Sequence, residues 1–99
     1  MMKVTVLYGH AKSPDEFEKY YQSTHLPLAA KIKGVDRLEL TKFISAPDGG
    51  KPAFHRMAGL YFATQAQMEQ SLGSAELQAA VADFENFATG GVTVLIGSV

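Results

Sequence analysis

Hydrophobic and polar residues alternate along four segments of the chain, and between these segments the apolar spacing changes to that of a helix. The predicted strands cover residues 3–8, 35–45, 54–63 and 92–96. The predicted helices run from residue 14 to 24 or 26, from 64 to 72, and from 74 onward. The order β-α-β-β-α-β predicts the α+β fold called ferredoxin-like, an antiparallel four-stranded sheet with helices on one face.

The helix boundaries have their own sequence signals. Capping boxes of the Ser/Thr-x-x-Glu/Gln type lie at residues 13–16 and 64–67, where two of the helices are predicted to begin. Pro27 is predicted to end the first helix, because proline lacks an amide hydrogen and disfavours a helical residue before it. A short helical piece over 27–33 follows, with Gly34 as its left-handed terminator. The inner face of the last helix is predicted to carry Leu77, Val81, Phe84 and Ala88, with Ala80 and Phe87 beside it.

Length and composition exclude several classes of function. Ninety-nine residues without a linker or a repeat predict a single domain over residues 1–99. A formal net charge of −1 without a basic stripe argues against nucleic acid or an anionic membrane as a partner. The absence of cysteine excludes disulfides, thiolate metal sites and cysteine nucleophiles. The N-terminal apolar run is too short for a signal peptide, and no stretch approaches the roughly 20 apolar residues of a membrane span, so we expect a soluble, cytoplasmic protein.

Neither face of the predicted sheet is plainly polar. In the third strand Ala58, Leu60 and Phe62 point to one side, while Met57 and Tyr61 point to the other. The helices of one chain cover only one face, and a sheet that is apolar on both faces needs a second cover. The simplest cover is a second copy of the chain, so we expect a two-fold homodimer with its sheets face to face.

The segment 17–28 combines aromatic residues with a histidine. Its predicted inner stripe consists of Phe17, Tyr20, Tyr21, Thr24, His25 and Leu28. Buried tyrosine and histidine side chains need hydrogen-bond partners or a ligand. His25 is the best candidate for acid–base chemistry, because a neutral imidazole exchanges protons near neutral pH. The alternative is a structural histidine that bonds a backbone carbonyl near Pro27. Tyr20 and Tyr21 point about 100° apart, so only one of them can face a given site.

Other constellations of catalytic or ligating residues are missing. His10, His25 and His55 lack the spacing of a metal motif, and neither haem nor flavin is called for, so we expect no metal and no cofactor. The chain has no phosphate-binding glycine loop and no Gly-x-Ser-x-Gly elbow. The pair His55-Arg56 is typical of a surface or dimer edge, and acidic residues such as Glu18 are predicted to lie on solvated helix surfaces.

The pattern Phe17-x-x-Tyr-Tyr-x-x-x-His25-x-Pro-Leu28 resembles the signature region of the EthD-like family of small dimeric α+β barrels. The strand order, the length and the late strand at 91–94 are also similar to that family. The resemblance implies a homodimer with a pocket between sheet and helices for a small aromatic or lipophilic molecule. The implied pocket residues are Tyr8, Phe17, Tyr21, His25 and Tyr61, with Leu38, Leu60 and Phe84 as an apolar wall. The wider superfamily includes lactone isomerases, cofactor-free monooxygenases, polyketide cyclases and haem enzymes, so the fold alone does not fix a reaction.

Two functions are compatible with these features. The first is a small cofactor-independent enzyme of monooxygenase, isomerase or cyclase type, acting on a hydrophobic or aromatic metabolite in catabolism or secondary metabolism. His25 would be its general acid or base, and the hydroxyl of Tyr21 would stabilise an oxyanion. The alternative is a non-catalytic binding or accessory protein for a hydrophobic metabolite, partnering an oxygenase. A purely structural dimer, in which His25 and the tyrosines only satisfy each other, is the third reading.

Overall fold

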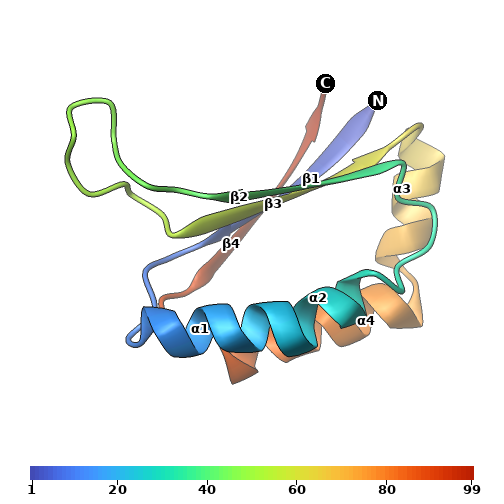
Figure 1. Ribbon diagram of the computed structural model, residues 1–99. Helices are drawn as coiled ribbons and strands as arrows, with labels where there is room; N and C mark the ends of the chain where they lie inside the picture. The colour runs from blue at the N-terminus through green and yellow to red at the C-terminus, as the bar shows by residue number, and fades with distance from the viewer.

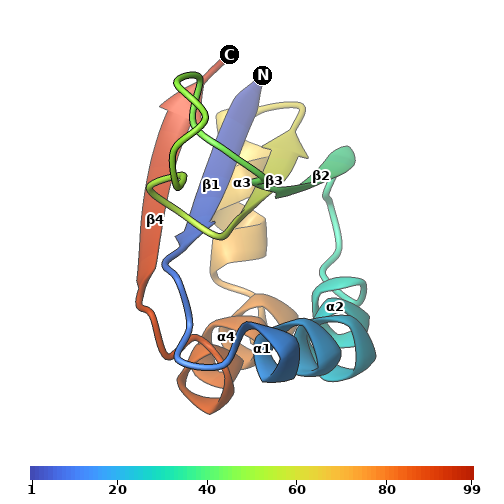
Figure 2. The same cartoon turned by 60° about the vertical axis from the view of Figure 1, so that its left-hand side comes forward.

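The computed structural model covers residues 1–99 and confirms the predicted α+β order (Figure 1). The strands are β1 (Met2–Tyr8), β2 (Arg37–Lys42), β3 (Arg56–Phe62) and β4 (Val92–Ser98). The helices are α1 (Pro14–Tyr20), α2 (Leu26–Ala29), α3 (Gln65–Leu72) and α4 (Ala75–Ala82), with a π-helical turn η1 (Tyr21–His25) and a 3-10 turn η2 (Asp83–Asn86). The sheet is antiparallel with the order β2-β3-β1-β4. Helix α1 runs on through η1 into α2, and α4 lies beside this continuous helix on one face of the sheet, while α3 leads from the sheet to this layer (Figure 2).

The strand register aligns side chains in rows across the sheet. Val6 pairs with Ala58 on one side and with Val94 on the other, and Ala58 pairs with Leu40. These four residues, named here the central row, cross all four strands on the helix-facing side, because directly paired residues of antiparallel strands share a face. The observed β2 (Arg37–Lys42) is shorter than the predicted strand over 35–45, and it pairs on one side only, with β3.

The predicted helix starts are confirmed by the capping contacts. The hydroxyls of Ser13, Thr64 and Ser74 each accept a hydrogen bond from the amide three residues later, at 3.4, 3.1 and 3.2 Å. Each cap satisfies an amide that has no partner within its helix and contributes about 1 kcal/mol to stability. Gly34 has a φ of 84°, as predicted for a left-handed terminator.

The first helix does not end before Pro27, contrary to the prediction, but continues through η1 into α2. The amide of Leu26 donates to the carbonyl of Tyr21, five residues earlier, which is the hydrogen bond of a π turn. In a regular α-helix the ring of Pro27 would clash with the carbonyl four residues before it. The wider π turn relieves this conflict by adding one residue at that point. The same turn carries Tyr21 and His25, whose rings stack with centroids 5.8 Å apart.

The inner face of the last helix also differs from the predicted stripe. Leu77, Ala80 and Phe87 are buried, whereas Val81 is exposed and Phe84 is only half-buried. The buried residues Leu77, Ala80, Asp83 and Phe87 follow one another at intervals of three or four residues, which is the spacing of one helix face. Val81 and Phe84 lie beside this face. After Ala82 the helix tightens into the 3-10 turn η2, which carries Asp83.

The opposite face of the sheet has no cover within the chain (Figure 1). It carries Leu7, Met57 and Leu95, and Leu95 is exposed. No helix of the structure has the length and apolar character required to cross a membrane.

A polar cluster joins α1 to β3 and corrects the prediction of solvated surfaces for these side chains. The Glu18 carboxylate accepts hydrogen bonds from Nε and Nη2 of Arg56 at 2.8 and 2.6 Å and from Nε2 of His55 at 3.1 Å. Lys42 lies 3.6 Å from the same carboxylate. All but Lys42 are largely shielded from solvent, because Arg56 projects from the sheet towards the helix layer. The cluster therefore acts as an ionic tie between helix and sheet.

This tie predicts an acid-dependent loss of stability. The hydrogen bonds from Arg56 lower the pKa of Glu18 from 4.5 to about 2, against the opposing effect of burial. A carboxyl whose pKa is lower in the folded state stabilises fully above its unfolded pKa and loses this contribution as the pH falls towards 2. We expect Glu18→Gln to lower the free energy of unfolding by about 1–2 kcal/mol at neutral pH. Below pH 4.5, the free energy of unfolding of this variant should fall less steeply with pH than that of the wild type. Urea unfolding over a pH series measures both effects, with the exposed Glu16→Gln as the control. An unchanged acid limb in Glu18→Gln would contradict the assignment.

Candidate active site

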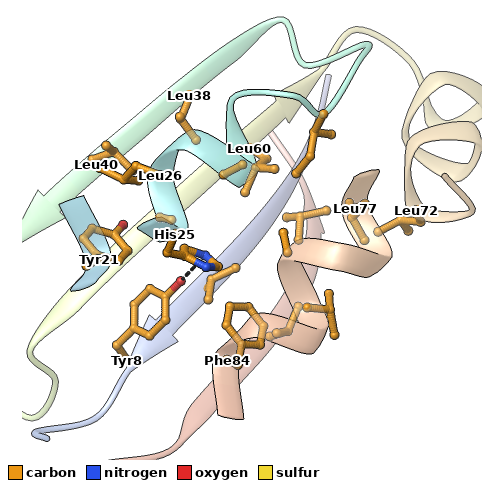
Figure 3. Close-up of a pocket in the computed structure, with 18 residues that line it drawn as sticks. Tyr8, Tyr21, His25, Leu26, Leu38, Leu40, Leu60, Leu72, Leu77 and Phe84 are labelled. Carbon is orange, nitrogen blue, oxygen red and sulfur yellow. Dashed lines mark hydrogen bonds between the residues drawn. The ribbon is translucent and has the colours of Figure 1, made fainter. Parts of the chain in front are cut away.

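A cavity of about 100 Å³ lies between the sheet and the helix layer (Figure 3). Its walls come from all four strands, from η1 and α2 on one side of the helix layer, and from α3, α4 and η2 on the other. Seventeen of its 18 lining residues are hydrophobic, and no lysine, arginine, aspartate or glutamate lines it. A cavity of this composition favours neutral, apolar molecules, because a charged ligand would lose its hydration without gaining an ion pair.

His25 is the one lining residue outside the hydrophobic class, and it forms the centre of a buried hydrogen-bond chain. Its Nδ1 lies 3.0 Å from Oδ2 of Asp83, and its Nε2 lies 3.3 Å from the hydroxyl of Tyr8 (Figure 3). An ionised carboxylate only accepts, so Nδ1 carries the proton and Nε2 accepts from the Tyr8 hydroxyl. All three side chains are buried. The lone pair of Nε2 therefore points towards the hydroxyl of Tyr8, and both residues line the cavity.

Asp83 is held in place by two further donors. The hydroxyl of Tyr20 donates to its Oδ1 at 2.6 Å, and the amide of Asn86 donates to the same oxygen at 3.0 Å. Burial alone would raise the pKa of Asp83, but the hydrogen bonds from Tyr20, Asn86 and His25 outweigh it and hold the pKa below its usual value. The carboxylate is therefore ionised at neutral pH and keeps Oδ2 for His25.

The environment of the imidazole sets its protonation state. Burial lowers the pKa of His25 below its ordinary value of 6.5, and the hydrogen bond and charge of Asp83 offset part of this lowering. The histidine is thus neutral at neutral pH and can accept a proton at Nε2. The imidazolium formed in that step is stabilised by the adjacent carboxylate. Burial raises the pKa of Tyr8 far above its ordinary value, so this phenol stays a hydrogen-bond donor.

Tyr21 also lines the cavity. Its side chain is fully buried, and its hydroxyl is the one buried side-chain polar atom without a hydrogen-bond partner. Burial raises its pKa to about 12, so the hydroxyl is protonated and can donate. A buried hydroxyl without a partner costs about 1–3 kcal/mol, which a ligand oxygen would recover. The question of which tyrosine faces the cavity is thereby answered, because Tyr20 points to Asp83 instead.

Six of the eight side chains proposed from the sequence lie around this cavity. They are Tyr8, Tyr21, His25, Leu38, Leu60 and Phe84. Phe17 does not reach the cavity but packs behind it, with its ring 5.4 Å from Tyr8 and 5.5 Å from Tyr21. Its placement in the pocket is therefore corrected to a core position that supports two lining tyrosines.

The placement of Tyr61 in the pocket is wrong. Successive residues of a strand point to opposite faces, and Leu60 takes the helix-facing side. Tyr61 therefore lies on the other face, where Lys3 and Arg37 lie over its ring at 5.0 and 4.1 Å. Its hydroxyl donates to Glu39 at 3.3 Å. Tyr61 supports the outer face of the sheet and has no access to the cavity.

Asp83 is the site residue that the sequence reasoning missed. A signal for it exists, because it lies three residues after Ala80 and four before Phe87, within the stripe that the last helix buries. An acid at such a position needs a buried partner, and a lone inward histidine is a suitable one. The structure contains no group of three or more acidic, histidine or cysteine side chains that could hold a metal ion.

Comparison with known proteins agrees with the ferredoxin-like α+β fold. The model of the EthD domain matches residues 10–91. An uncharacterised 11.0 kDa protein from the thcB-thcC intergenic region of Rhodococcus erythropolis is 42% identical over 95 residues, covering 96% of this chain and 91% of that protein. The chain belongs to the EthD family.

Solved structures support the same fold. An EthD-family protein from Bacillus halodurans superposes with a TM-score of 0.92 at 28% identity, covering 100% of this chain and 98% of that one. SnoaB from Streptomyces nogalater, a cofactor-independent oxygenase whose N63A variant was solved, gives a TM-score of 0.65 at 13% identity, covering 99% and 90%. The second likeness concerns the fold alone.

Proposed function

We propose that this protein is a cofactor-independent enzyme of monooxygenase, isomerase or cyclase type, acting on a small, neutral, hydrophobic or aromatic metabolite. One observation carries the proposal: the buried chain Asp83–His25–Tyr8 lies at an otherwise apolar cavity. Buried polar networks are costly unless fully satisfied, and a histidine oriented by a carboxylate is the usual arrangement of a general base. The common fold with a cofactor-independent oxygenase also supports this class of reaction.

The catalytic step would be a proton transfer. The substrate places an acidic C–H or O–H against Nε2 of His25, which displaces the long contact to Tyr8, and Nε2 takes the proton. Asp83 stabilises the imidazolium, and the hydroxyl of Tyr21 donates to the oxygen on which negative charge develops. Return of the same proton to another substrate atom completes an isomerisation or a cyclisation. The apolar walls exclude water, which strengthens each of these interactions.

A non-catalytic binding or accessory protein that partners an oxygenase is the second candidate. The unpaired hydroxyl of Tyr21 favours it, because a donor of this kind holds a ligand oxygen whether or not a reaction follows. In that case His25 serves as a hydrogen-bond partner of the ligand and not as a base.

We also propose a homodimer formed through the uncovered face of the sheet. Leu7, Met57 and Leu95 lie on this face and would be shielded by the same face of a second copy. The helix-facing cavity would then remain accessible in each subunit, since it lies on the opposite side of the sheet.

Native mass spectrometry of gently purified protein, followed by a conversion assay, tests these proposals. The expected result is a dimer that retains a small neutral molecule. Incubation of that molecule with fresh protein, with air as the only additive, is expected to return a chemically altered product. Recovery of the unaltered molecule would overturn the enzyme proposal and support the binding protein, and a stable monomer would overturn the dimer.

A further inference from the structure

The cavity extends across the whole width of the sheet. All four residues of the central row line it, from Leu40 on the edge strand β2 to Val94 on the edge strand β4. The two inner members, Ala58 and Val6, are buried, whereas Leu40 and Val94 are 40% and 48% exposed. The lining therefore reaches solvent at both edges of the sheet and is closed between them.

Both ends are apolar. Leu38 lies next to Leu40 along β2 and is 42% exposed, and Val81 of α4 is a 45% exposed lining residue. Large apolar side chains that stay exposed at the rim of a cavity mark places where an apolar group of a ligand lies. We name the two rims the β2 mouth (Leu38, Leu40) and the β4 mouth (Val81, Val94).

The polar atoms lie between the mouths. His25 is buried, and Figure 3 shows its imidazole between Leu40 of the β2 mouth and Phe84, which lies one helical turn after Val81 of the β4 mouth. Tyr8, its partner, belongs to β1, which is an inner strand of the sheet. A ligand that binds these polar atoms and reaches both mouths therefore extends in both directions from its polar group.

We propose that the ligand of this cavity is an elongated, uncharged molecule that lies across the strands. It carries a hydrogen-bonding oxygen near mid-length and one apolar arm towards each mouth. The absence of charged lining residues excludes a chain that ends in a carboxylate or phosphate inside the cavity. The inference rests on the proposed site around His25 but concerns the shape of the ligand, and it holds for an enzyme and for a binding protein alike.

Positional isomers of one ketone test the inference. Three gaps between four strands span about 14 Å, and the extended chain of nonan-5-one is about 10 Å long, so it can direct one arm towards each mouth from a central carbonyl. Titrations followed by amide NMR shifts are expected to show nonan-5-one binding about tenfold more tightly than nonan-2-one, because a terminal carbonyl leaves one mouth empty and about two CH₂ groups in water. Nonanoate is expected to bind more weakly still. Equal or tighter binding of nonan-2-one or nonanoate would overturn the proposal.

Blocking each mouth separately gives the second test. Leu40→Trp and Val94→Trp are each expected to weaken binding of nonan-5-one by about tenfold and to leave pentan-3-one, which reaches neither mouth, unchanged. Ile44→Trp, at a 90% exposed position outside the cavity lining, is the matched control. If either mouth variant binds nonan-5-one as tightly as the wild type, the cavity has one functional mouth and the inference fails. The proposed reaction is judged separately, by conversion of the retained molecule, and does not depend on this outcome.

Discussion

Replacement of His25 by alanine is expected to lower turnover of the retained molecule by about 10³-fold or more. The reason is that no other lining side chain can accept a proton at neutral pH: Tyr8 and Tyr21 are protonated phenols, and the remaining walls are apolar. The measurement is the single-turnover rate of wild type and variant under identical conditions. Full activity in His25→Ala would show that the imidazole is not the base.

The control for this prediction is a measurement showing that the variant is still folded. His25→Ala leaves Oδ2 of Asp83 and the hydroxyl of Tyr8 without their partner, which costs about 1–3 kcal/mol. A variant that lost activity through unfolding would lose its near-ultraviolet circular dichroism as well. His25→Gln retains a side-chain amide that can bond Asp83, and it is expected to be folded and equally inactive.

The variant Asp83→Asn tests the contribution of Asp83 while His25 remains able to accept a proton. Removal of the carboxylate removes the interaction that raises the pKa of His25, so this pKa falls further below its ordinary value. The rate of a neutral base rises with pH through its pKa, and the acid limb of the pH–rate profile is therefore expected to move to lower pH. The maximal rate is expected to drop by about 10²-fold, because the amide no longer stabilises the imidazolium. An acid limb that moves to higher pH would contradict the role given to Asp83.

Much of the fold could be predicted from the chain because its signals are local. Ser13, Thr64 and Ser74 cap the helices that they were expected to cap, and strand periodicity indicates which residues share a face. The errors lie where tertiary structure changes the local geometry. Pro27 indicates a helix end on its own, but the π turn before it lets the helix continue. In the last helix, the buried face runs through Asp83, whose carboxylate bonds His25, and not through Phe84 as predicted.

The candidate site was predictable in part for the same reason. His25 and Tyr21 share one turn, so the sequence places them together, and the resemblance adds Tyr8. Asp83 lies 58 residues from His25, and no spacing rule connects residues so far apart. The polar partner of His25 is therefore identified only from the structure, in which η1 and η2 lie close together. The partly buried ion pair of Glu18 was missed similarly, since its partner Arg56 lies 38 residues away.

Replacement of Phe17 by alanine is expected to cost about 3–5 kcal/mol of unfolding free energy, the largest stability effect that we predict. Phe17 is almost fully buried, and its ring centroid lies 5.2 Å from that of Phe87 and 4.9 Å from that of His55. The total free energy of unfolding of a protein domain is only about 5–15 kcal/mol, so the variant should be close to unfolding at 37 °C. Urea denaturation with linear extrapolation measures the change.

Two further variants test whether the packing of Phe17 also affects ligand binding. Phe17→Leu keeps most of the volume and is expected to cost about 1.5 kcal/mol, whereas Ile44→Ala, at an exposed position, should change stability by less than about 0.5 kcal/mol. Because Phe17 packs directly behind Tyr8 and Tyr21, the smaller leucine lets both tyrosines shift, and affinity for the retained molecule should fall even though Phe17 does not line the cavity. An unchanged affinity in folded Phe17→Leu would show that the two tyrosines are held in place by other contacts, such as the π turn and Phe87.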